Sequence, residues 1–442
     1  MNEASVDLIA ATLTRRTDAF ECFRLERCGQ SIAFEAGKLR SAKTAQTSGV
    51  GVRVVRDGRL AVGGTGDPTA IDAMIDSTIQ AAAFGDACEF AFAPPAGACG
   101  VNVFEPRVRE MGAAELVAIG RRVLEQLADF IGSSDGRATL NVGVWTNCDR
   151  FALVNSADQR ADYQTTGLGV SISVECFGDD DILMVWDSDE GCTAGLDVDA
   201  LIARVRQKLD WGRTLAPAGD VGTTPPMIFT PQGFNALLGP LITGLDGRNV
   251  ADGISPLADK LDGAPILDPR LTVLDDATAP ARPGSLPFDD EGVPGERTVL
   301  IDAGRAVNFL LDLRSAAELG RASTGNAHRD LTSAPAPTPS NLIALPGETP
   351  LAQMIGDVAD GLLIDYLIGA GHGNILAGDY SNTIGLGFRI RDGRIVGRVK
   401  DLSIAGNVYR DLARVTAIED RNHWRGSTCL PHVRVDGVQL AG

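Results

Sequence analysis

The stretch that decides the fold is GHGNILAGDYSNTIGLGFRIRDGRIVGRVKDLSIAGN, residues 371–407. At its centre the pair Asp392-Gly393 lies between two apolar runs that contain Phe388 and Ile395. An Asp-Gly pair in this setting predicts a β-hairpin, because a type I′ turn requires positive φ at both central residues. Residues 401–407 then predict a returning strand. This part of the chain is therefore expected to be mainly β.

The same turn chemistry recurs elsewhere in the chain. The segment GVRVVRDGRLAV at 51–62 is centred on Asp57-Gly58, and VLIDAGRAVNFL at 299–310 is a weaker third copy. Internal duplication would explain the recurrence, but repeated use of a favourable turn explains it as well. Both alternatives remain open.

The first half of the chain predicts an antiparallel sheet that carries helices on a face. Apolar residues at helical spacing predict helices at 4–15, after the cap and N1 pair Asp67-Pro68, at 112–131 and at 197–211. The strands are expected within 20–65 and at 138–147, 150–156, 160–176 and 181–188.

The second half predicts a β-rich domain. Residues 214–226 are rich in Pro, Gly and Ala and are the predicted linker between an N-terminal domain, 1–213, and a C-terminal domain, 227–442. A strand at 227–230, a helix at 232–244, a loop to about 292 and strands from 297 onward, with one helix near 350–369, are expected to follow. The predicted fold class is α+β.

Composition excludes several classes of protein. The chain has 442 residues and a formal net charge of −18, so its surface should repel nucleic acid. No apolar run reaches the length of a membrane span, and the first residues lack a secretory pattern. The eight cysteines form no C-x-x-C pair, which favours reduced thiols. We expect a cytoplasmic protein with no nucleic-acid or membrane partner.

The chain resembles the TldD/PmbA family, also called the modulator of DNA gyrase family, and within it the noncatalytic TldE/PmbA branch. The resemblance rests on Gly378-Asp379-Tyr380-Ser381, the hairpin at 387–395 and the run DLSIAGN at 401–407. Further similar blocks lie at 48–64, 285–292, 314–326 and 426–442. The resemblance implies a C-terminal domain of the family type and a pairing between a zinc-bearing subunit and a TldE-like one around a peptide cleft.

The zinc-binding motif of the family's catalytic subunits is missing here. That motif, H-E-x-x-x-H, supplies two imidazole ligands and a glutamate base for the zinc-bound water. No histidine of this chain is followed by glutamate, and the apparent counterpart is Asn235-Ala236-Leu237-Leu238-Gly239-Pro240. We therefore expect no catalytic or metal-binding residue and no cofactor in this chain, with zinc only in a TldD-like partner.

The remaining histidines offer one other metal hypothesis. Cys429 and His432, with His423 nearby, form the one cluster of soft ligands in the sequence, although a thiol and an imidazole at the start of a strand need no metal. His328 and His372 are isolated and are interpreted as surface or loop residues.

Candidate peptide-groove residues come from two regions. Phe288 lies in SLPFDDEG, 285–292, whose carboxylates Asp289, Asp290 and Glu291 predict either an acid–base pair or a solvated acidic turn. The short polar side chains of 323–326 suit hydrogen bonding to an extended peptide, or simply a turn. The full set of candidates is Phe288, Ser323, Thr324, Gly325, Asn326, Asn374, Gly378, Asp379, Tyr380 and Ser381.

Three functional hypotheses follow. In the first, the chain is a subunit without its own catalytic zinc in a TldD/TldE-type metalloprotease that acts on unfolded or leader peptides. In the second, it is a stand-alone homo-oligomer that binds or modifies peptides or metabolites in a biosynthetic pathway. In the third, it is an enzyme with a metal site around Cys429 and His432. Whether the chain alone is an enzyme is left open.

Overall fold

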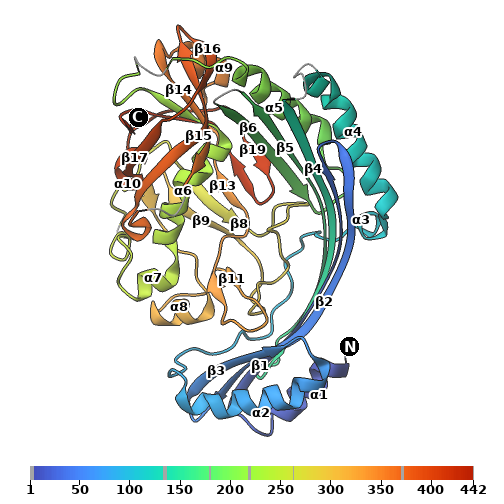
Figure 1. Ribbon diagram of the computed structural model, residues 1–442. Coiled ribbons are helices and arrows are strands. Elements are labelled where there is room, and N and C mark those ends of the chain that lie inside the picture. Colours follow the sequence, from blue (N-terminus) through green and yellow to red (C-terminus); the bar gives the residue numbers. More distant parts are fainter. Residues whose placement is uncertain are drawn as a thin grey trace.

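The N-terminal half forms one six-stranded antiparallel sheet in the order β3-β2-β1-β4-β5-β6. The computed structural model describes residues 4–132, 137–178, 181–217, 221–261, 263–369 and 373–441. The long strands of the six-stranded sheet curve around the C-terminal half of the molecule (Figure 1). The strands are β1 (Ala19–Glu35), β2 (Lys38–Arg56), β3 (Arg59–Thr65), β4 (Ala138–Asn155), β5 (Arg160–Phe177) and β6 (Ile182–Gly191).

The strand β4 differs from the expectation of two strands at 138–147 and 150–156. Its middle residue Cys148 pairs with Cys28 of β1 on one side and with Thr166 of β5 on the other. Because both neighbours continue without interruption, the polar residues between the two apolar runs stay in register. The result is one strand of 18 residues.

The helices of this half cover different parts of the sheet. Leu116, Val123 and Leu127 of α4 pack on the sheet together with Leu201 and Val205 of α5. The helices α1 and α2 lie at the far end of the sheet, where α2 contacts β3 and α1 contacts β1 and β4 (Figure 1). Bounds are α1 (Ala4–Leu13), α2 (Ile71–Ala81), α3 (Pro106–Glu110), α4 (Ala113–Gly132) and α5 (Val198–Gly212), with 3-10 turns η1 (Pro68–Ala70) and η2 (Ala82–Phe84).

The C-terminal half contains two larger sheets. One has the order β18-β21-β7-β14-β15-β17-β22, with β16 paired to β15, and the other has the order β10-β9-β8-β13-β20-β19. Its strands are β7 (Met227–Phe229), β8 (Val273–Asp276), β9 (Arg297–Asp302), β10 (Arg305–Ala306), β11 (Ala327–His328), β12 (Ala336–Pro337), β13 (Leu342–Ala344), β14 (Asp360–Ile368), β15 (Asp379–Arg391), β16 (Arg394–Val399), β17 (Ser403–Asn407), β18 (Val415–Ile418), β19 (His423–Arg425), β20 (Thr428–Leu430), β21 (Val433–Val435) and β22 (Gln439–Ala441). Its helices are α6 (Pro231–Leu245), α7 (Gly247–Ala251), α8 (Leu313–Glu318), α9 (Leu351–Gly356) and α10 (Val408–Leu412), with the 3-10 turn η3 (Ile375–Ala377). The predicted α+β class is confirmed.

The predicted hairpin is present. It joins β15 to β16, and its two central residues have positive φ, 47° at Asp392 and 72° at Gly393. Asp57 and Gly58 also have positive φ, and this pair joins β2 to β3. Type I′ turn chemistry therefore fixes the register of a hairpin in each half of the molecule.

The helix expected near 350–369 is wrong for most of its length. The helix α9 ends at Gly356, and residues 360–368 form β14. Residues 361–365 of this strand are all buried, between β7 on one side and β15 on the other. A strand buried on both faces carries a continuous apolar run, which periodicity alone does not separate from a buried helix.

One hydrophobic core is shared between the two halves. Ile228, Leu363, Phe388 and Ile390 of the C-terminal sheet pack in the same cluster as residues of α4, α5 and β4–β6. The division into domains at 214–226 stays a prediction, since the core crosses it. Within the described ranges, no helix combines the length and the apolar character needed to cross a membrane.

Candidate functional site

A cleft of about 310 Å³ lies where the N-terminal sheet meets the start of the C-terminal half. We call it the inter-half cleft. The strands β4 and β6 supply one wall, whereas α6 and the β19–β20 hairpin supply the other. It is lined by Trp145, Trp186, Asp187, Ser188, Asp189, Glu190, Pro231, Gln232, Asn235, Pro283, Arg425, Gly426, Ser427 and Thr428.

Buried charges connect the two walls of the cleft. The carboxylate of Asp187 lies 2.9 Å from Nη1 of Arg425 and 3.2 Å from Nζ of Lys208. The same Lys208 Nζ lies 2.8 Å from Oδ2 of Asp365 on β14. Burial raises the pKa of Asp187, but the charges of Lys208 and Arg425 outweigh burial and lower this pKa. The ion pairs therefore hold α5 and β6 of the first half against β14 and β19 of the second.

The cleft offers aromatic faces next to carboxylates. Trp186 is 44% exposed, and Trp145 lines the cleft near Glu190. Burial raises the pKa of Glu190, while Oδ1 of Asp189 accepts a bond of 3.3 Å from the backbone of Gly426. Aromatic faces beside carboxylates suit extended chain with cationic or amide groups.

The helix α6 contains residues 235–240, the segment that the sequence resemblance matches to an H-E-x-x-x-H motif. It begins with Thr230, whose hydroxyl accepts a hydrogen bond from Gly233 N, and with Pro231 at the first helical position. Asn235 on its first turns is exposed and lines the cleft, whereas Pro240 is buried within the helix. Ala236 has no proton-accepting atom and Pro240 has no side-chain ligand, so these residues do not fit the zinc of an H-E-x-x-x-H site.

The acidic block at 289–291 is buried, so the interpretation as a solvated turn is wrong. The Glu291 carboxylate lies 2.6 Å from Nη1 of Arg53, which also forms a bidentate pair with Glu21. Asp289 accepts hydrogen bonds from the backbone of Glu291, Val293 and Ala327. Asp290 accepts a hydrogen bond of 2.8 Å from Arg329 N and lies 3.1 Å from Nδ1 of His328. Each of the three carboxylates therefore has its own partners, and the block does not form an acid–base pair of two carboxylates.

The candidate groove residues Ser323–Asn326 are mostly buried and make internal hydrogen bonds. The hydroxyl of Thr324 accepts a bond of 2.8 Å from Leu311 N, and Asn326 Nδ2 donates to Asp275 over 2.7 Å. The Ser323 hydroxyl donates to Leu311 O over 3.0 Å, and Gly325 has a φ of 66°. Phe288 is 5% exposed and packs with Phe23, Phe151 and Leu153. Phe288 therefore packs between the halves, whereas Ser323–Asn326 bond within the C-terminal half, and their role at a groove stays a prediction.

The other candidate groove residues lie in a different sheet. Asn374 caps η3, Gly378 has a φ of 89°, and Asp379 accepts a bond of 2.9 Å from Asn407 Nδ2. The buried Tyr380 donates its hydroxyl to Asp411 of α10 over 2.8 Å, while Ser381 is exposed on β15. This group contacts β17 and α10, whereas Ser323–Asn326 contacts β8, so the structure does not bring the two groups together. His372 lies outside the described residues.

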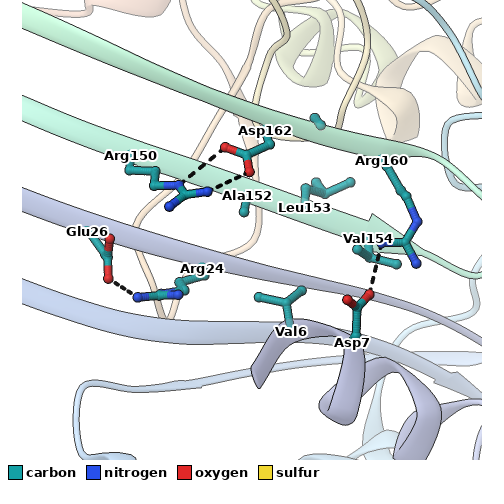
Figure 2. Close-up of a pocket in the computed structure, with 11 residues that line it drawn as sticks. Val6, Asp7, Arg24, Glu26, Arg150, Ala152, Leu153, Val154, Arg160 and Asp162 are labelled. Atoms are coloured by element: carbon teal, nitrogen blue, oxygen red, sulfur yellow. Dashed lines mark hydrogen bonds and ion pairs between the residues drawn. The ribbon is translucent and has the colours of Figure 1, made fainter. Parts of the chain in front are cut away.

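A second cavity, of about 300 Å³, lies between α1 and the far ends of β1, β4 and β5. Figure 2 shows three ion pairs on its walls, Arg24 with Glu26, Arg150 with Asp162 and Arg160 with Asp7. Each arginine that lines it has a carboxylate partner, and none of the candidate residues lies there. We assign it no function.

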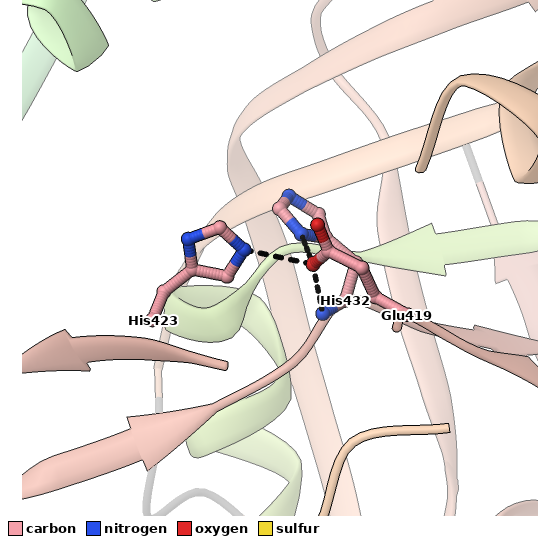
Figure 3. A group of neighbouring side chains, drawn as sticks. All are labelled: Glu419, His423 and His432. Atoms are coloured by element: carbon pink, nitrogen blue, oxygen red, sulfur yellow. Dashed lines mark hydrogen bonds and ion pairs between the residues drawn. The ribbon is translucent and has the colours of Figure 1, made fainter. Parts of the chain in front are cut away.

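A third group of interest consists of Glu419, His423 and His432, whose ligand atoms all lie within 4.8 Å of one another (Figure 3). Burial raises the pKa of Glu419, but hydrogen bonds from His423 and His432 outweigh burial and lower this pKa to about 2. Burial lowers the pKa of the His432 imidazole. Cys429 is not part of this group, and burial raises the pKa of its thiol to about 11. The cluster of soft ligands expected from the sequence is therefore formed with Glu419 in place of Cys429.

The fold is that of an α+β protein with a cleft between its two halves. The family model of the PmbA/TldA metallopeptidase domain 1 matches residues 20–82, and that of the PmbA/TldA metallopeptidase C-terminal domain matches residues 222–442. The chain belongs to the PmbA/TldD family.

Individual relatives agree with this assignment. A protein of Methanothermobacter thermautotrophicus named metalloprotease is 26% identical over 409 residues, which cover 88% of this chain and 85% of the relative. Metalloprotease PmbA of Escherichia coli O157:H7 is 32% identical over 217 residues, 48% of this chain and 46% of the relative. The crystal structure of TldE from Thermococcus kodakarensis matches with a TM-score of 0.88 over 99% of this chain and 100% of that one, at 23% identity, which shows the same fold.

Sequence reasoning did not single out the lining of the inter-half cleft. Trp145, Trp186 and Arg425 belong to three separate strands, and no spacing in the sequence relates them. The acidic run Asp187-Ser188-Asp189-Glu190 was a usable signal, because consecutive carboxylates at the end of an apolar strand are unusual without partners. Glu419 was missed as well, since it lies four residues before His423 and thirteen before His432.

Proposed function

We propose that the chain is the TldE/PmbA-like subunit of a TldD/TldE-type metallopeptidase acting on unfolded or leader peptides. It contributes part of a peptide-binding surface, and a TldD-like partner contributes the zinc that cleaves. The observation that carries the proposal is at α6. This helix presents Asn235 to a cleft between the two halves, where the family's catalytic subunits have a zinc-binding motif, and neither Ala236 nor Pro240 can replace the missing ligand or base.

The cleft supports a peptide as the substrate class. Its exposed Trp186 offers an apolar face, and Asp189 and Glu190 offer acceptors for backbone or basic groups. A further feature is the open edge of β2. Residues 38–48 pair with β1 on one side, whereas the pairing with β3 begins at Val50. An open edge of this kind binds extended chain through backbone hydrogen bonds.

The test compares the chain alone with the chain mixed with a TldD-like partner that carries H-E-x-x-x-H. The substrate is an unstructured fluorogenic peptide, and the chain is purified from a host that lacks the partner. We expect no cleavage by the chain alone, cleavage by the mixture, and arrest of that cleavage by a zinc chelator. Chelator-sensitive cleavage by the chain alone, at the same specific activity in independent preparations, would overturn the proposal.

A matched pair of variants tests the role of the cleft. Trp186→Ala removes the exposed aromatic face and should raise the KM of the mixture about 30-fold if Trp186 anchors the peptide with about 2 kcal/mol. The control is Phe84→Ala, since Phe84 is 92% exposed in η2 at the far end of the molecule. The stand-alone hypothesis predicts instead a homo-oligomer on gel filtration that forms no complex with a TldD-like chain.

A further inference from the structure

Three side chains from separate segments converge on one point. Glu419 directly follows β18, His423 begins β19, and His432 precedes β21. Oε2 of Glu419 lies 2.8 Å from Nε2 of His423 and 2.6 Å from Nδ1 of His432. Figure 3 shows both imidazoles turned toward this single carboxylate oxygen.

Backbone hydrogen bonds hold two of these three residues, Glu419 and His432, in place. Glu419 N donates a hydrogen bond of 2.9 Å to His432 O, and His432 N donates one of 3.1 Å to Oε2 of Glu419. Both side chains are largely buried, with 3% of Glu419 and 12% of His432 exposed, whereas His423 is 31% exposed. The site is therefore preformed on one side and reachable from solvent on the other.

We propose that Glu419, His423 and His432 bind one divalent transition-metal ion, with zinc the best match. Two imidazole nitrogens and one carboxylate oxygen are a donor set that proteins use for zinc with a fourth position left to water. The present N–O separations of 2.6 and 2.8 Å are those of hydrogen bonds. Donors on a tetrahedral ion with bonds of about 2.0 to 2.1 Å lie about 3.3 to 3.4 Å apart, so Oε2 and the ring nitrogens must separate by about 0.5 Å at His423 and about 0.8 Å at His432. His423 is 31% exposed and Glu419 can shift its carboxylate, so both separations open without moving the backbone of His432.

The convergence of donors on one oxygen is better suited to an ion than to hydrogen bonds alone. Oε2 of Glu419 receives two ring nitrogens and one backbone N–H, while the nearest cationic group to Oε1 is Nε of Arg421 at 3.9 Å. A metal that binds His423 Nε2 and His432 Nδ1, with each imidazole proton carried on its other ring nitrogen, keeps all three side chains engaged.

The site is distinct from the family's zinc motif and joins the cleft through one strand. His423 and Arg425 are two residues apart on β19, so their side chains leave the same face of the strand. Arg425 reaches Asp187 and Gln232 in the inter-half cleft. An ion on His423 would restrict β19 and thereby the position of Arg425 in that cleft.

The experiment loads the full chain with zinc(II), removes unbound metal by desalting, and measures zinc by elemental analysis. We expect about one zinc per chain and a melting temperature that rises with zinc and falls back with chelator. Glu419→Gln and His423→Asn should each weaken zinc binding by more than 100-fold, because even changes outside the ligand shell cost about 10- to 100-fold. His328→Asn is the control, since His328 pairs with Asp290 elsewhere in the molecule.

A second readout separates coordination from a merely structural role. Cobalt(II) in place of zinc should give visible ligand-field absorption in the wild-type protein and in His328→Asn, and none in Glu419→Gln. Less than about 0.1 zinc per chain in the wild type, or the same zinc content in Glu419→Gln, would overturn the proposal. The proposal does not rest on the peptidase role. Mixing Glu419→Gln with a TldD-like partner shows separately whether this ion contributes to cleavage.

Discussion

The two Asp-Gly hairpins provide a matched test of the turn argument. Gly58 and Gly393 have nearly the same φ, 71° and 72°, and follow Asp residues whose φ is also positive. Their surroundings differ. A Cβ at Gly58 would meet no atom within 4 Å, whereas a Cβ at Gly393 would lie 2.8 Å from Gly356 O and 3.0 Å from Gly356 Cα. Substitution by Ala therefore adds the same backbone strain at both sites and a clash at only one.

The expected costs follow from these two terms. An L-residue in the left-handed region costs about 1 to 2 kcal/mol, and the lower entropy of the unfolded chain returns about 0.4 to 1 kcal/mol of that. Gly58→Ala should therefore lower the free energy of unfolding by about 1 kcal/mol. The clash at Gly393 is with backbone, which cannot rotate away, so overpacking adds about 1 to 3 kcal/mol. Gly393→Ala should cost about 2 to 4 kcal/mol.

The assay is urea unfolding followed by circular dichroism, with the slope compared between variants to confirm that the same transition is observed. Asn at each position is a useful further variant, since Asn tolerates positive φ. Gly58→Asn should leave the free energy of unfolding nearly unchanged, whereas Gly393→Asn should lower it by most of the amount expected for Gly393→Ala. Equal losses for Gly58→Ala and Gly393→Ala would refute the reasoning, because contact with Gly356 would then have no energetic consequence.

Two further predictions concern buried charge. Lys208→Met leaves Asp365 buried without the cation at 2.8 Å, so the free energy of unfolding should fall by about 3 to 5 kcal/mol. The double variant Lys208→Met, Asp365→Asn should recover part of that loss. A loss under about 1 kcal/mol for Lys208→Met in urea unfolding would contradict the argument. Burial raises the pKa of Asp275 to about 7, so between about pH 4 and pH 7 the folded protein holds a proton that the unfolded chain has lost. Stability should therefore fall as pH rises through that window, and melting temperatures measured across it should show a flatter profile for Asp275→Asn than for the wild type.

Local turn chemistry was enough to predict some elements but not others. The hairpins at Asp57-Gly58 and Asp392-Gly393 depend on two residues each, and the cap Asp67 depends on the first turn that follows. The strand β14 depends on neighbours far away in the sequence. Its apolar run is compatible with a helix until β7 and β15 are known to flank it.

The candidate site was harder to predict because its parts come from both halves. The acidic block at 289–291 resembles a surface turn in composition, yet its carboxylates are buried by pairing with Arg53 and with backbone amides from residues 293 and 327. The resemblance to a family predicts that residues 235–240 stand in the place of a zinc motif. It did not indicate which side chains surround that place, since Trp145, Trp186 and Arg425 meet only after the two sheets pack.

The core shared between the halves has a consequence for folding during synthesis. The sheet and helices of the first half are complete in sequence at Gly212, but their cluster includes Phe388 and Ile390 from β15. A ribosome adding about 5 to 20 residues per second needs about 10 to 35 s to make the intervening chain. During that interval the apolar surface beneath α5 and β6 has no native cover. The nascent protein is therefore a natural client for chaperones that hold exposed apolar surface until the final strands emerge.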